Sequence, residues 1–338
     1  MRRAFRYFMT SILSIFFTLL AVGVIYIVAD THSRIQIQDD KKTGLTSSSY
    51  SSEEVEALVD QAEAQGRNNV LTSIKESLEN GNTVISILKS LYPEYIVVAA
   101  NSKYNFVPID ESLPKNNYDI DNLTDENGMY VYTKDGQVTS KFGIDVSSHQ
   151  GDIDWEAVAD EGVEFAFIRA VYRGYGTGKL VVDEKCLENI EGAQAAGIDV
   201  GVYVFSQAIS QAEVLEEAGT VIDLLDGYTL QLPIVFDVEK VGDSQARTNS
   251  LTVEERTNLT IAFLEAVKNA GYEPMVYHNT EMGAMLVDLT QLTDYPKWFA
   301  GYNKEFYWPY EYDVWQYSEN GSINGINGKV DFDIWLTQ

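Results

Sequence analysis

The 338-residue chain has little cysteine, little histidine and few basic residues, and each shortage excludes a class of site. Cys186 is its one cysteine, which rules out an intrachain disulfide, a cysteine-based zinc site and an iron–sulfur cluster. The three histidines, His32, His149 and His278, lie far apart in the sequence. A histidine-based metal centre would therefore require distant segments to converge, and we expect none.

Basic residues are outnumbered about two to one, with 24 Lys and Arg against 51 Asp and Glu and a net charge of -27. Such a surface repels a phosphate backbone, so we expect no nucleic-acid partner. The acidity is concentrated in residues 142–338, which carry 11 basic and 33 acidic residues (net -22), whereas residues 1–141 carry 13 and 18 (net -5). This difference in net charge indicates that residues 142–338 form a separate unit. Its acidic surface would repel polyanions, so we expect the unit to find its substrate by specific contacts.

The N-terminus contains an uncharged stretch of 23 residues, 7–29, preceded by Arg2, Arg3 and Arg6. As a helix this stretch would span about 35 Å, enough for the hydrocarbon core of a bilayer. Residues 1–30 therefore predict a cytoplasmic tip and an uncleaved transmembrane signal anchor, a single pass that leaves the rest of the chain outside a bacterial cell membrane. The alternative is a secreted protein released by signal cleavage, although the apolar stretch is longer than a typical signal and lacks a small-x-small site.

Between the anchor and residue 142 the sequence predicts two parts. Residues 31–51 are polar and serine-rich, typical of a linker. Residues 52–141 predict a small extracellular α+β region, with helices from Ser52 that break near Gly66 or Gly81, a strand and turn in 92–109, and a hairpin around Asp135-Gly136. We interpret this region as a spacer; the alternative is that it binds a cell-wall or membrane protein partner.

Residues 142–338 alternate short apolar runs with helical stretches. The helical stretches lie at 183–196, 210–225 and 252–270, whereas the links between the last three runs are too short for full helices. This pattern predicts an α/β fold, a parallel barrel whose final third has lost its helices. The eight expected strands are FGIDV, EFAFIRA, IDVGVYVF, LPIVFDV, EPMVYH, KWFAGY, YDVWQY and KVDFDIW.

Acidic side chains follow several of these strands, where a barrel collects its chemistry. Asp145 ends the first strand, Asp237 and Glu239 end PIVFDVE, and Asp331 lies in the last strand. Residues i and i+2 of a strand point to one side, so Asp237 and Glu239 share a face. Their mutual repulsion would raise the pKa of one carboxyl group and keep that of the other low. A glycosidase needs such a pair, because one group must stay protonated as the acid and the other must be an anion. The alternative is a strand end with two solvated acids.

Aromatic residues crowd the segment between 302 and 317. Rings with polar tips suit the flat faces and hydroxyl rims of sugars, although about half of these side chains are expected to pack in the core. They are Tyr302, Phe306, Tyr307, Trp308, Tyr310, Tyr312, Trp315 and Tyr317.

Six motifs now carry a family resemblance: FGIDVSSHQGDIDW, FAFIRAVYRGYGTG, NIEGAQAAGIDVGVYVFS, LPIVFDVE, WFAGYN and VWQYSENGSINGINGKVDFD. Their order over about 195 residues resembles glycoside hydrolase family 25, the lysozymes (N-acetylmuramidases) that cleave bacterial peptidoglycan. The resemblance implies a (β/α)5(β)3 TIM-like barrel, no metal and no cofactor. It implies cleavage of the β-1,4 bond between N-acetylmuramic acid and N-acetylglucosamine, with peptidoglycan glycan strands as the partner.

By position, the resemblance assigns catalysis to Glu239 and Asp237, with Asp145 and Asp331 as flanking carboxylates. Substrate contacts fall on an aromatic and amide set that includes Tyr302 from the aromatic segment, namely Tyr203, Tyr277, Trp298, Tyr302 and Gln316.

Two positions depart from the family pattern: Val204 stands where histidine is frequent, and Asp333 stands where an amide is usual. Both bear on substrate preference or pH optimum. The leading hypothesis is a membrane-anchored muramidase. The alternatives are a non-catalytic peptidoglycan-binding module and a cell-wall assembly protein on the same barrel, and the four carboxylates favour the enzyme.

Overall fold

The computed structural model describes residues 50–302 and 307–336, and it divides the chain after Leu91 into two compact units. The expected membrane anchor, residues 7–29, and most of the expected linker lie outside the described residues. Within the described ranges, no helix combines the length and the apolar character needed to cross a bilayer.

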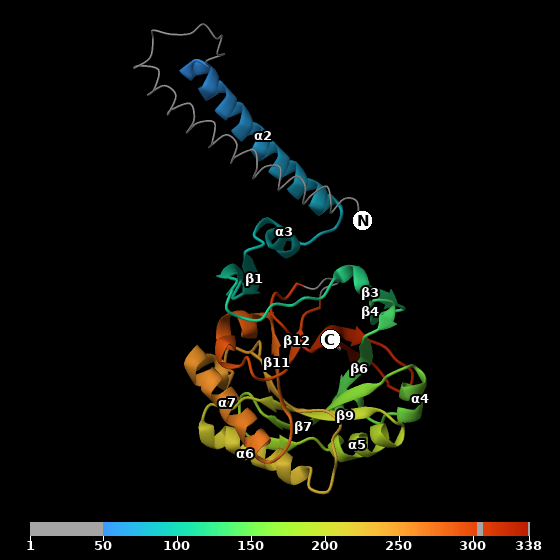
Figure 1. Cartoon of the computed structure of the whole chain (residues 1–338). Helices are drawn as coiled ribbons and strands as arrows, with labels where there is room; N and C mark the ends of the chain where they lie inside the picture. The colour runs from blue at the N-terminus through green and yellow to red at the C-terminus, as the bar shows by residue number, and fades with distance from the viewer. Residues whose placement is uncertain (1–49, 303–306, 337–338) are drawn as a thin grey trace. The chain divides into compact units, whose positions relative to one another are not determined.

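The first unit contains two helices, α2 (Ser52–Glu79) and α3 (Val84–Leu91) (Figure 1). A capping box begins α2, because the Ser51 side chain accepts from the Glu54 backbone N–H and the Glu54 side chain accepts from that of Ser51. The helix passes through Gly66 and ends before Gly81, whose φ of 83° suits glycine. The expected break is thus at Gly81, and α2 buries none of its residues.

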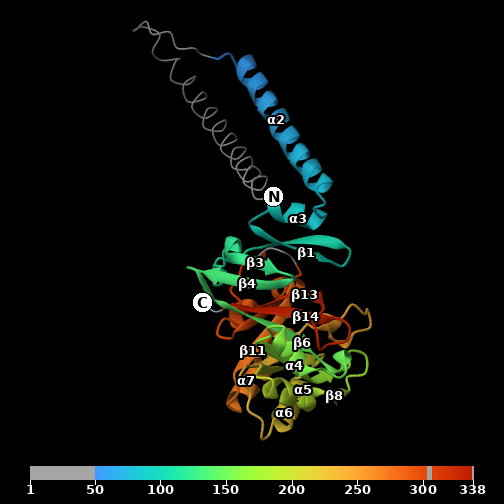
Figure 2. The same ribbon diagram turned by 90° about the vertical axis from the view of Figure 1, so that its right-hand side faces the viewer.

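The second unit is built on a closed barrel of eight strands, at the places where the apolar runs predict them (Figures 1 and 2). The barrel closes because β6 pairs with both β7 and β14. A short extra strand, β8 (Leu180–Val182), pairs with the end of β7. The barrel strands are β6 (Ser140–Val146), β7 (Phe165–Arg173), β9 (Asp199–Ser206), β10 (Ile234–Val238), β11 (Pro274–Asn279), β12 (Lys297–Ala300), β13 (Val314–Gly321) and β14 (Val330–Leu336).

Helices cover the outside of only part of this barrel. They follow the first four strands as α4 (Trp155–Asp160), α5 (Cys186–Ala195), α6 (Gln211–Leu224) and α7 (Val253–Asn269). After β11 come a π-helical turn, Met282–Leu286, and a short 3₁₀ helix, Leu289–Gln291, and the links that follow β12 and β13 contain no helix among their described residues. The expected barrel with five helical links and three bare strands is therefore present, with its fifth helix reduced to these two short turns.

The last strand departs from the expected parallel arrangement. Seven strands run parallel, whereas β14 is antiparallel to both β13 and β6. The reason is the short link at 322–329, which can close a hairpin but cannot cross the barrel. As a result, the first residues of β14 lie at the same rim as the carboxyl ends of the other strands.

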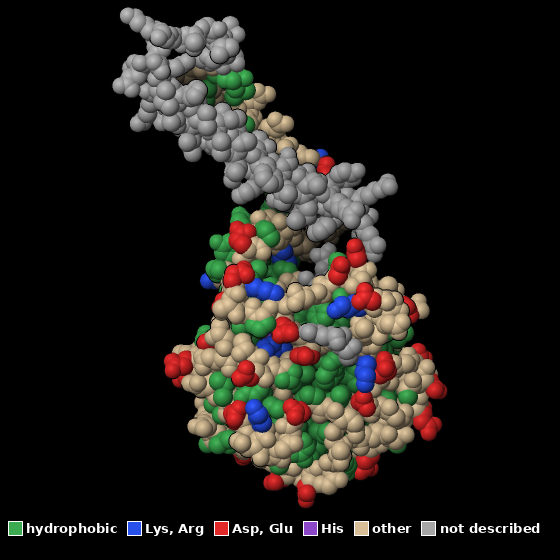
Figure 3. Space-filling view, in the orientation of Figure 1, with side chains coloured by type: hydrophobic (Ala, Val, Ile, Leu, Met, Phe, Trp, Pro, Cys, Tyr) green, Lys and Arg blue, Asp and Glu red, His purple; other side chains and the backbone are tan. Residues whose placement is uncertain are grey.

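Large side chains fill the barrel interior, including Phe165, Phe167 and Trp298. Glycine is required beside them: a Cβ on Gly143 would lie 2.4 Å from the Phe165 ring, and one on Gly201 would lie 2.6 Å from the Phe167 ring. A second apolar layer lies between the strands and the helices. The acidic side chains of this unit are spread across the face seen in Figure 3 and do not form a single patch.

Residues 92–139 belong to the barrel unit, so the observed division differs from the expected boundary at residue 142. The predicted strand and turn is a hairpin, β1 (Tyr95–Ala100) with β2 (Lys103–Pro108), and β3 (Leu123–Glu126), β4 (Met129–Lys134) and β5 (Gln137–Val138) form a small sheet. Asp135 and Gly136 make the predicted turn, with φ of 53° and 76°.

The aromatic segment fastens these strands to the barrel. The Tyr307 hydroxyl accepts from the Val97 backbone N–H at 2.6 Å, and the Tyr317 hydroxyl accepts from that of Tyr130 at 3.2 Å. The Tyr317 ring also stacks on the Tyr130 ring at 4.2 Å. Most described aromatics of this segment, buried like Trp308, therefore serve packing, a larger share than the half that we expected.

Candidate active site

A cavity of about 560 Å³ opens at the rim where the parallel strands end. It brings together all nine catalytic and substrate-binding residues that the sequence analysis predicts. They lie on seven different strands or directly after them. These residues are Asp145, Tyr203, Asp237, Glu239, Tyr277, Trp298, Tyr302, Gln316 and Asp331. The structure thus places the predicted residues in one site, and their individual roles stay predictions.

The four carboxylates reach the cavity from three strands. Asp237 lies near the end of β10 and Glu239 follows that strand, while Asp145 lies near the end of β6. Asp331 is the second residue of β14 and is paired directly with Asp145 across the antiparallel ladder. The reversed direction of β14 is therefore what brings the fourth carboxylate to this rim.

Gln316 is the centre of the hydrogen-bond network. Its Nε2 donates to Asp145 Oδ2 at 2.6 Å and to Asp331 Oδ2 at 3.4 Å. Its Oε1 accepts from the Tyr277 hydroxyl at 2.8 Å and from the Tyr302 hydroxyl at 3.0 Å. Because the two hydroxyls occupy the carbonyl oxygen, the amide nitrogen must face the carboxylates, which fixes their positions relative to the aromatic wall.

Burial raises the pKa of every carboxylate in the set. Burial and then the Asp331 charge raise the pKa of Glu239 to about 7. Burial and then the Glu239 charge hold the pKa of Asp237 well above its usual range, and Asp237 Oδ1 has no hydrogen-bond partner among the described residues. Burial and then the Glu319 charge raise the pKa of Asp331 to about 6.

The expected split, one raised pKa beside one low pKa, is therefore not found in this cavity. Both Asp237 and Glu239 are shifted upward because desolvation acts on both of them. Arg169 lowers the pKa of Asp237 in part, but its guanidinium is already bonded to Asp183 at 2.7 Å. Two carboxyl groups that interact in this way lose their protons in two separate steps.

The sequence reasoning missed six other residues that line the cavity: Ser148, His149, Arg169, Tyr172, Phe205 and Glu319. Arg169 is the only Lys or Arg in the described lining. Its guanidinium lies 4.8 Å from the centre of the Tyr172 ring. The period-2 pattern of Phe165, Phe167 and Arg169 on β7 was the signal that could have found it, because alternate residues share the inner face.

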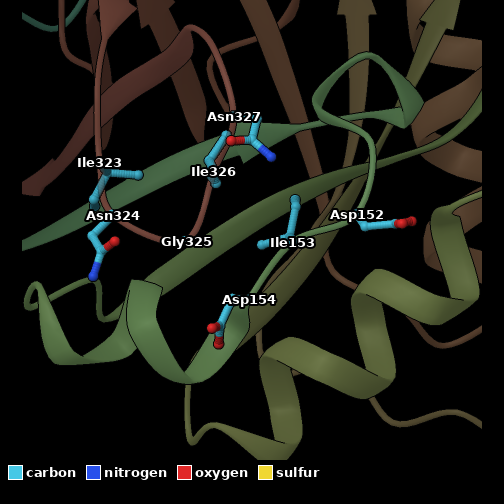
Figure 4. Close-up of a pocket in the computed structure, with 8 residues that line it drawn as sticks. All are labelled: Asp152, Ile153, Asp154, Ile323, Asn324, Gly325, Ile326 and Asn327. Carbon is cyan, nitrogen blue, oxygen red and sulfur yellow. The ribbon is translucent and has the colours of Figure 1, made fainter.

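A second pocket, of about 500 Å³, lies beside the segment that connects β6 to α4 (Figure 4). Residues 152–154 face the loop 323–327 across it, and the Asp154 N–H donates to the Gly325 carbonyl at 2.9 Å. None of the predicted site residues lines this pocket. Within the described chain, no group of three His, Cys, Asp or Glu side chains is arranged to hold a metal ion.

Comparison with known proteins identifies relatives of the barrel. A family model described as "Glycosyl hydrolases family 25" matches residues 144–326, more than half of the chain. The "Autolytic lysozyme" of Clostridium acetobutylicum is 29% identical over 192 residues, which cover 56% of this chain and 54% of that protein. The "Uncharacterized protein YegX" of Escherichia coli K12 is 30% identical over 208 residues, covering 57% of this chain and 68% of that one. The chain thus spans about half the length of the first relative.

Two solved structures share the fold. The modular autolysin LytC of Streptococcus pneumoniae has a TM-score of 0.54 and 24% identity, covering 63% of this chain and 52% of that one. The spore cortex lytic enzyme SleM of Clostridium perfringens has a TM-score of 0.52 and 25% identity, covering 60% and 69%.

Proposed function

Since the chain belongs to glycosyl hydrolase family 25, we propose that it is a muramidase that cleaves the β-1,4 bond between N-acetylmuramic acid and N-acetylglucosamine in bacterial peptidoglycan. The observation that carries the proposal is the convergence of four carboxylates, Asp145, Asp237, Glu239 and Asp331, in one cavity at the catalytic rim. The names of two relatives, "Autolytic lysozyme" and "Lysozyme M1" from Streptomyces globisporus, support it.

Glu239 acts as the general acid in this proposal. Cleavage of a glycosidic bond needs a proton on the leaving oxygen, and a carboxyl group supplies it only if it is still protonated at the working pH. Burial and the nearby Asp331 charge raise the pKa of Glu239 to about 7, so that the proton is retained near neutrality.

Asp237 acts as the partner of Glu239 that becomes an anion. A carboxylate below the sugar stabilises the positive charge that develops at the anomeric carbon, either by direct attack or by orienting the N-acetyl group of the substrate. Burial and then the Glu239 charge raise the pKa of Asp237, and the Arg169 charge partly offsets them because it favours the anionic form of that carboxyl.

The remaining polar residues hold the substrate and the acids in position. Asp145 and Asp331 are joined through Gln316, and Tyr277 orients that amide. Tyr302 is 49% exposed at the rim and offers its ring to a sugar face. Trp298 is only 1% exposed, so it forms the wall beneath the sugar.

The test of this function is zymography of the full chain on peptidoglycan, with Glu239→Gln and Asp237→Asn beside it. A clear band from the wild type that both variants lose supports the muramidase. Retained binding to walls without lysis by the wild type would favour the alternative, a non-catalytic wall-binding or assembly protein on the same barrel.

We propose further that residues 7–29 anchor the enzyme in the cell membrane with the barrel outside. The support is the uncharged apolar stretch that follows three arginines. The protein should fractionate with membranes, and external protease should digest the barrel on intact protoplasts. A soluble chain that begins near Asp30 would instead demonstrate cleavage and secretion.

Residues 52–91 then serve as a spacer between membrane and barrel, or as the binding segment for a cell-wall or membrane protein. The support for a spacer is α2, a 28-residue helix whose side chains are all unburied. Its length as a helix is about 42 Å, enough to separate a catalytic unit from a membrane surface.

A further inference from the structure

Gln207 is a buried polar residue that follows β9 directly and does not line the active-site cavity. It is completely buried, with 0% of its surface exposed. Its Nε2 donates to the backbone carbonyl of Glu239 at 3.1 Å, and its Oε1 accepts from the Thr248 hydroxyl at 3.0 Å. Because a carbonyl oxygen can only accept, the amide nitrogen must face Glu239 and the amide oxygen must face Thr248. Both polar atoms of this buried amide therefore have a partner.

The two partners of Gln207 lie at the two ends of one loop. β10 ends at Val238, so Glu239 is the first residue of this loop, and Thr248 lies in the short 3₁₀ turn that ends it. A single amide thus joins the beginning of the loop to its end. Arg247, in the same turn, reinforces this attachment, because its guanidinium donates to the backbone carbonyl of Gln207 at 3.4 Å.

Glu239 depends on this attachment because the sheet does not hold it. The ladder between β10 and β11 ends at Asp237, and the ladder between β10 and β9 ends at Val238. Among the described residues, no hydrogen bond holds the Glu239 carboxyl group, so its position in the cavity follows that of the main chain. The next residue, Lys240, forms an ion pair with Glu281 at 2.9 Å, but both of these side chains reach solvent, where such a pair contributes little.

We propose that Gln207 is a positioning residue for the general acid: it holds the main chain of Glu239 where the sheet ends and so keeps the carboxyl group buried in the cavity. The proposal rests on the muramidase function, in which Glu239 protonates the leaving oxygen. Gln207 acts through Glu239, because it does not line the cavity itself. A displaced main chain would move the carboxyl away from the leaving oxygen and expose it to water, and a misplacement of about 1 Å can cost about 10²-fold in rate.

The role of Gln207 predicts a change in pH dependence as well as in rate. Burial is the largest cause that raises the pKa of Glu239 to about 7. Loss of the Gln207 bond lets water reach the carboxyl, so its pKa should fall and the alkaline limb of kcat/KM should move to lower pH. A residue that contributed only stability would leave this limb in place. The titratable and charged groups that surround Glu239 are unchanged in such a variant: Arg169 on β7, Asp237 on β10, Tyr277 on β11, Tyr302 after β12, Asp331 on β14 and the adjacent Lys240.

The experiment compares wild type with Gln207→Met, which keeps an unbranched side chain of similar length but removes both hydrogen bonds. The kcat of the variant on soluble peptidoglycan fragments should fall by about tenfold or more with little change in KM, and its alkaline limb should move to lower pH. On an aryl glycoside of the same sugar, whose phenolate leaves without a proton, the variant should recover most of its lost rate.

Thr248→Val is the second variant, since it removes only the hydroxyl that orients the amide and keeps the shape of the side chain. It should lower kcat by a smaller factor and move the limb in the same direction, and it decides the inference if Gln207→Met does not fold. Gln231→Met is the matched control, because Gln231 Oε1 accepts from the Val200 backbone N–H at 3.2 Å near the start of β9, at the other end of the barrel. This control also loses a structural hydrogen bond, but its kcat and pH profile should be those of wild type.

Two results would overturn the inference. One is a folded Gln207→Met with the kcat and the alkaline limb of wild type. The other is an equal loss of rate on peptidoglycan and on the aryl glycoside with the limb in place, which would make Gln207 a structural residue only. An inactive wild type would refute the muramidase proposal instead. NMR titration of the Glu239 carboxyl, assigned through Glu239→Gln, then decides the inference, because its pKa should be lower in Gln207→Met than in wild type and equal values would contradict it.

Discussion

Glu239→Gln gives the sharpest test of the proposed acid, because the structure predicts both a rate and a pH dependence. The pKa of Glu239 is raised to about 7, chiefly by burial. The acid must be protonated, so activity is present below this pKa and lost above it. The protonated fraction falls from about 90% at pH 6 to about 10% at pH 8, which predicts a roughly tenfold fall in kcat/KM for wild type.

The assay is a pH series of kcat/KM on soluble peptidoglycan fragments, since kcat/KM reports the ionisation of the free enzyme. Glu239→Gln should lower the rate at pH 6 by about 10²-fold or more. Its residual rate should show no fall with the pKa of Glu239, because glutamine does not titrate. Glu164→Gln, at an exposed residue just before β7, is the matched control and should behave as wild type.

A substrate with a phenol leaving group separates the acid from its partner. A phenolate departs without protonation, so Glu239→Gln should recover most of its lost rate on this substrate, whereas Asp237→Asn should not. Near wild-type turnover of Glu239→Gln on peptidoglycan would refute the assignment. The acid would then have to be one of the other three carboxylates.

Three further predictions follow from the same structure. Asp331→Asn removes a charge that raises the pKa of Glu239, so the alkaline limb of kcat/KM should move to lower pH; an unchanged limb would show that burial alone sets that pKa. Tyr317→Phe leaves the buried Tyr130 N–H unpaired and should lower the free energy of unfolding by about 2 kcal/mol in urea, whereas Tyr175→Phe, at an exposed tyrosine, should change it little. Removal of residues 50–91 should leave the rate on soluble fragments unchanged, whereas removal through 139 should abolish soluble expression because it uncovers the aromatic face; a stable, active protein after the longer deletion would contradict this packing.

The sequence predicts the barrel well because the strands have a strong local signal. Runs such as LPIVFDV are short, apolar and bounded by turns, and each becomes a strand of the barrel. The positions of the carboxylates follow from the same pattern, since Asp145 and Asp237 directly end such runs. The substrate-binding residues of the predicted site were assigned from the family resemblance. No periodicity in the sequence would identify Gln316 as the centre of the hydrogen-bond network.

Long-range packing is what the sequence does not reveal. The aromatic crowding around Trp308 suits a sugar platform and a packing surface equally, because composition does not say what lies opposite. In the structure, most of this segment packs against residues 92–139, and the bonded pairs are 187 to 210 positions apart in the chain. The same limit applies to Asp333, which the sequence marks only as a departure from the family pattern, because its bond with the Trp298 Nε1–H joins two strands that lie far apart in the sequence.

The direction of β14 joins the fold to the chemistry. A parallel eighth strand would place its first residues at the opposite end of the barrel, about 20 Å from the other acids. The short hairpin from β13 reverses the strand, so that Asp331 pairs with Asp145 and Asp333 lies directly beneath them. Five carboxyl groups then share one desolvated region, and Arg169, the one Lys or Arg of the described lining, is already paired with Asp183. Burial raises the pKa of each of these groups, and a carboxyl group that is still protonated near neutral pH is what an acid-catalysed cleavage requires.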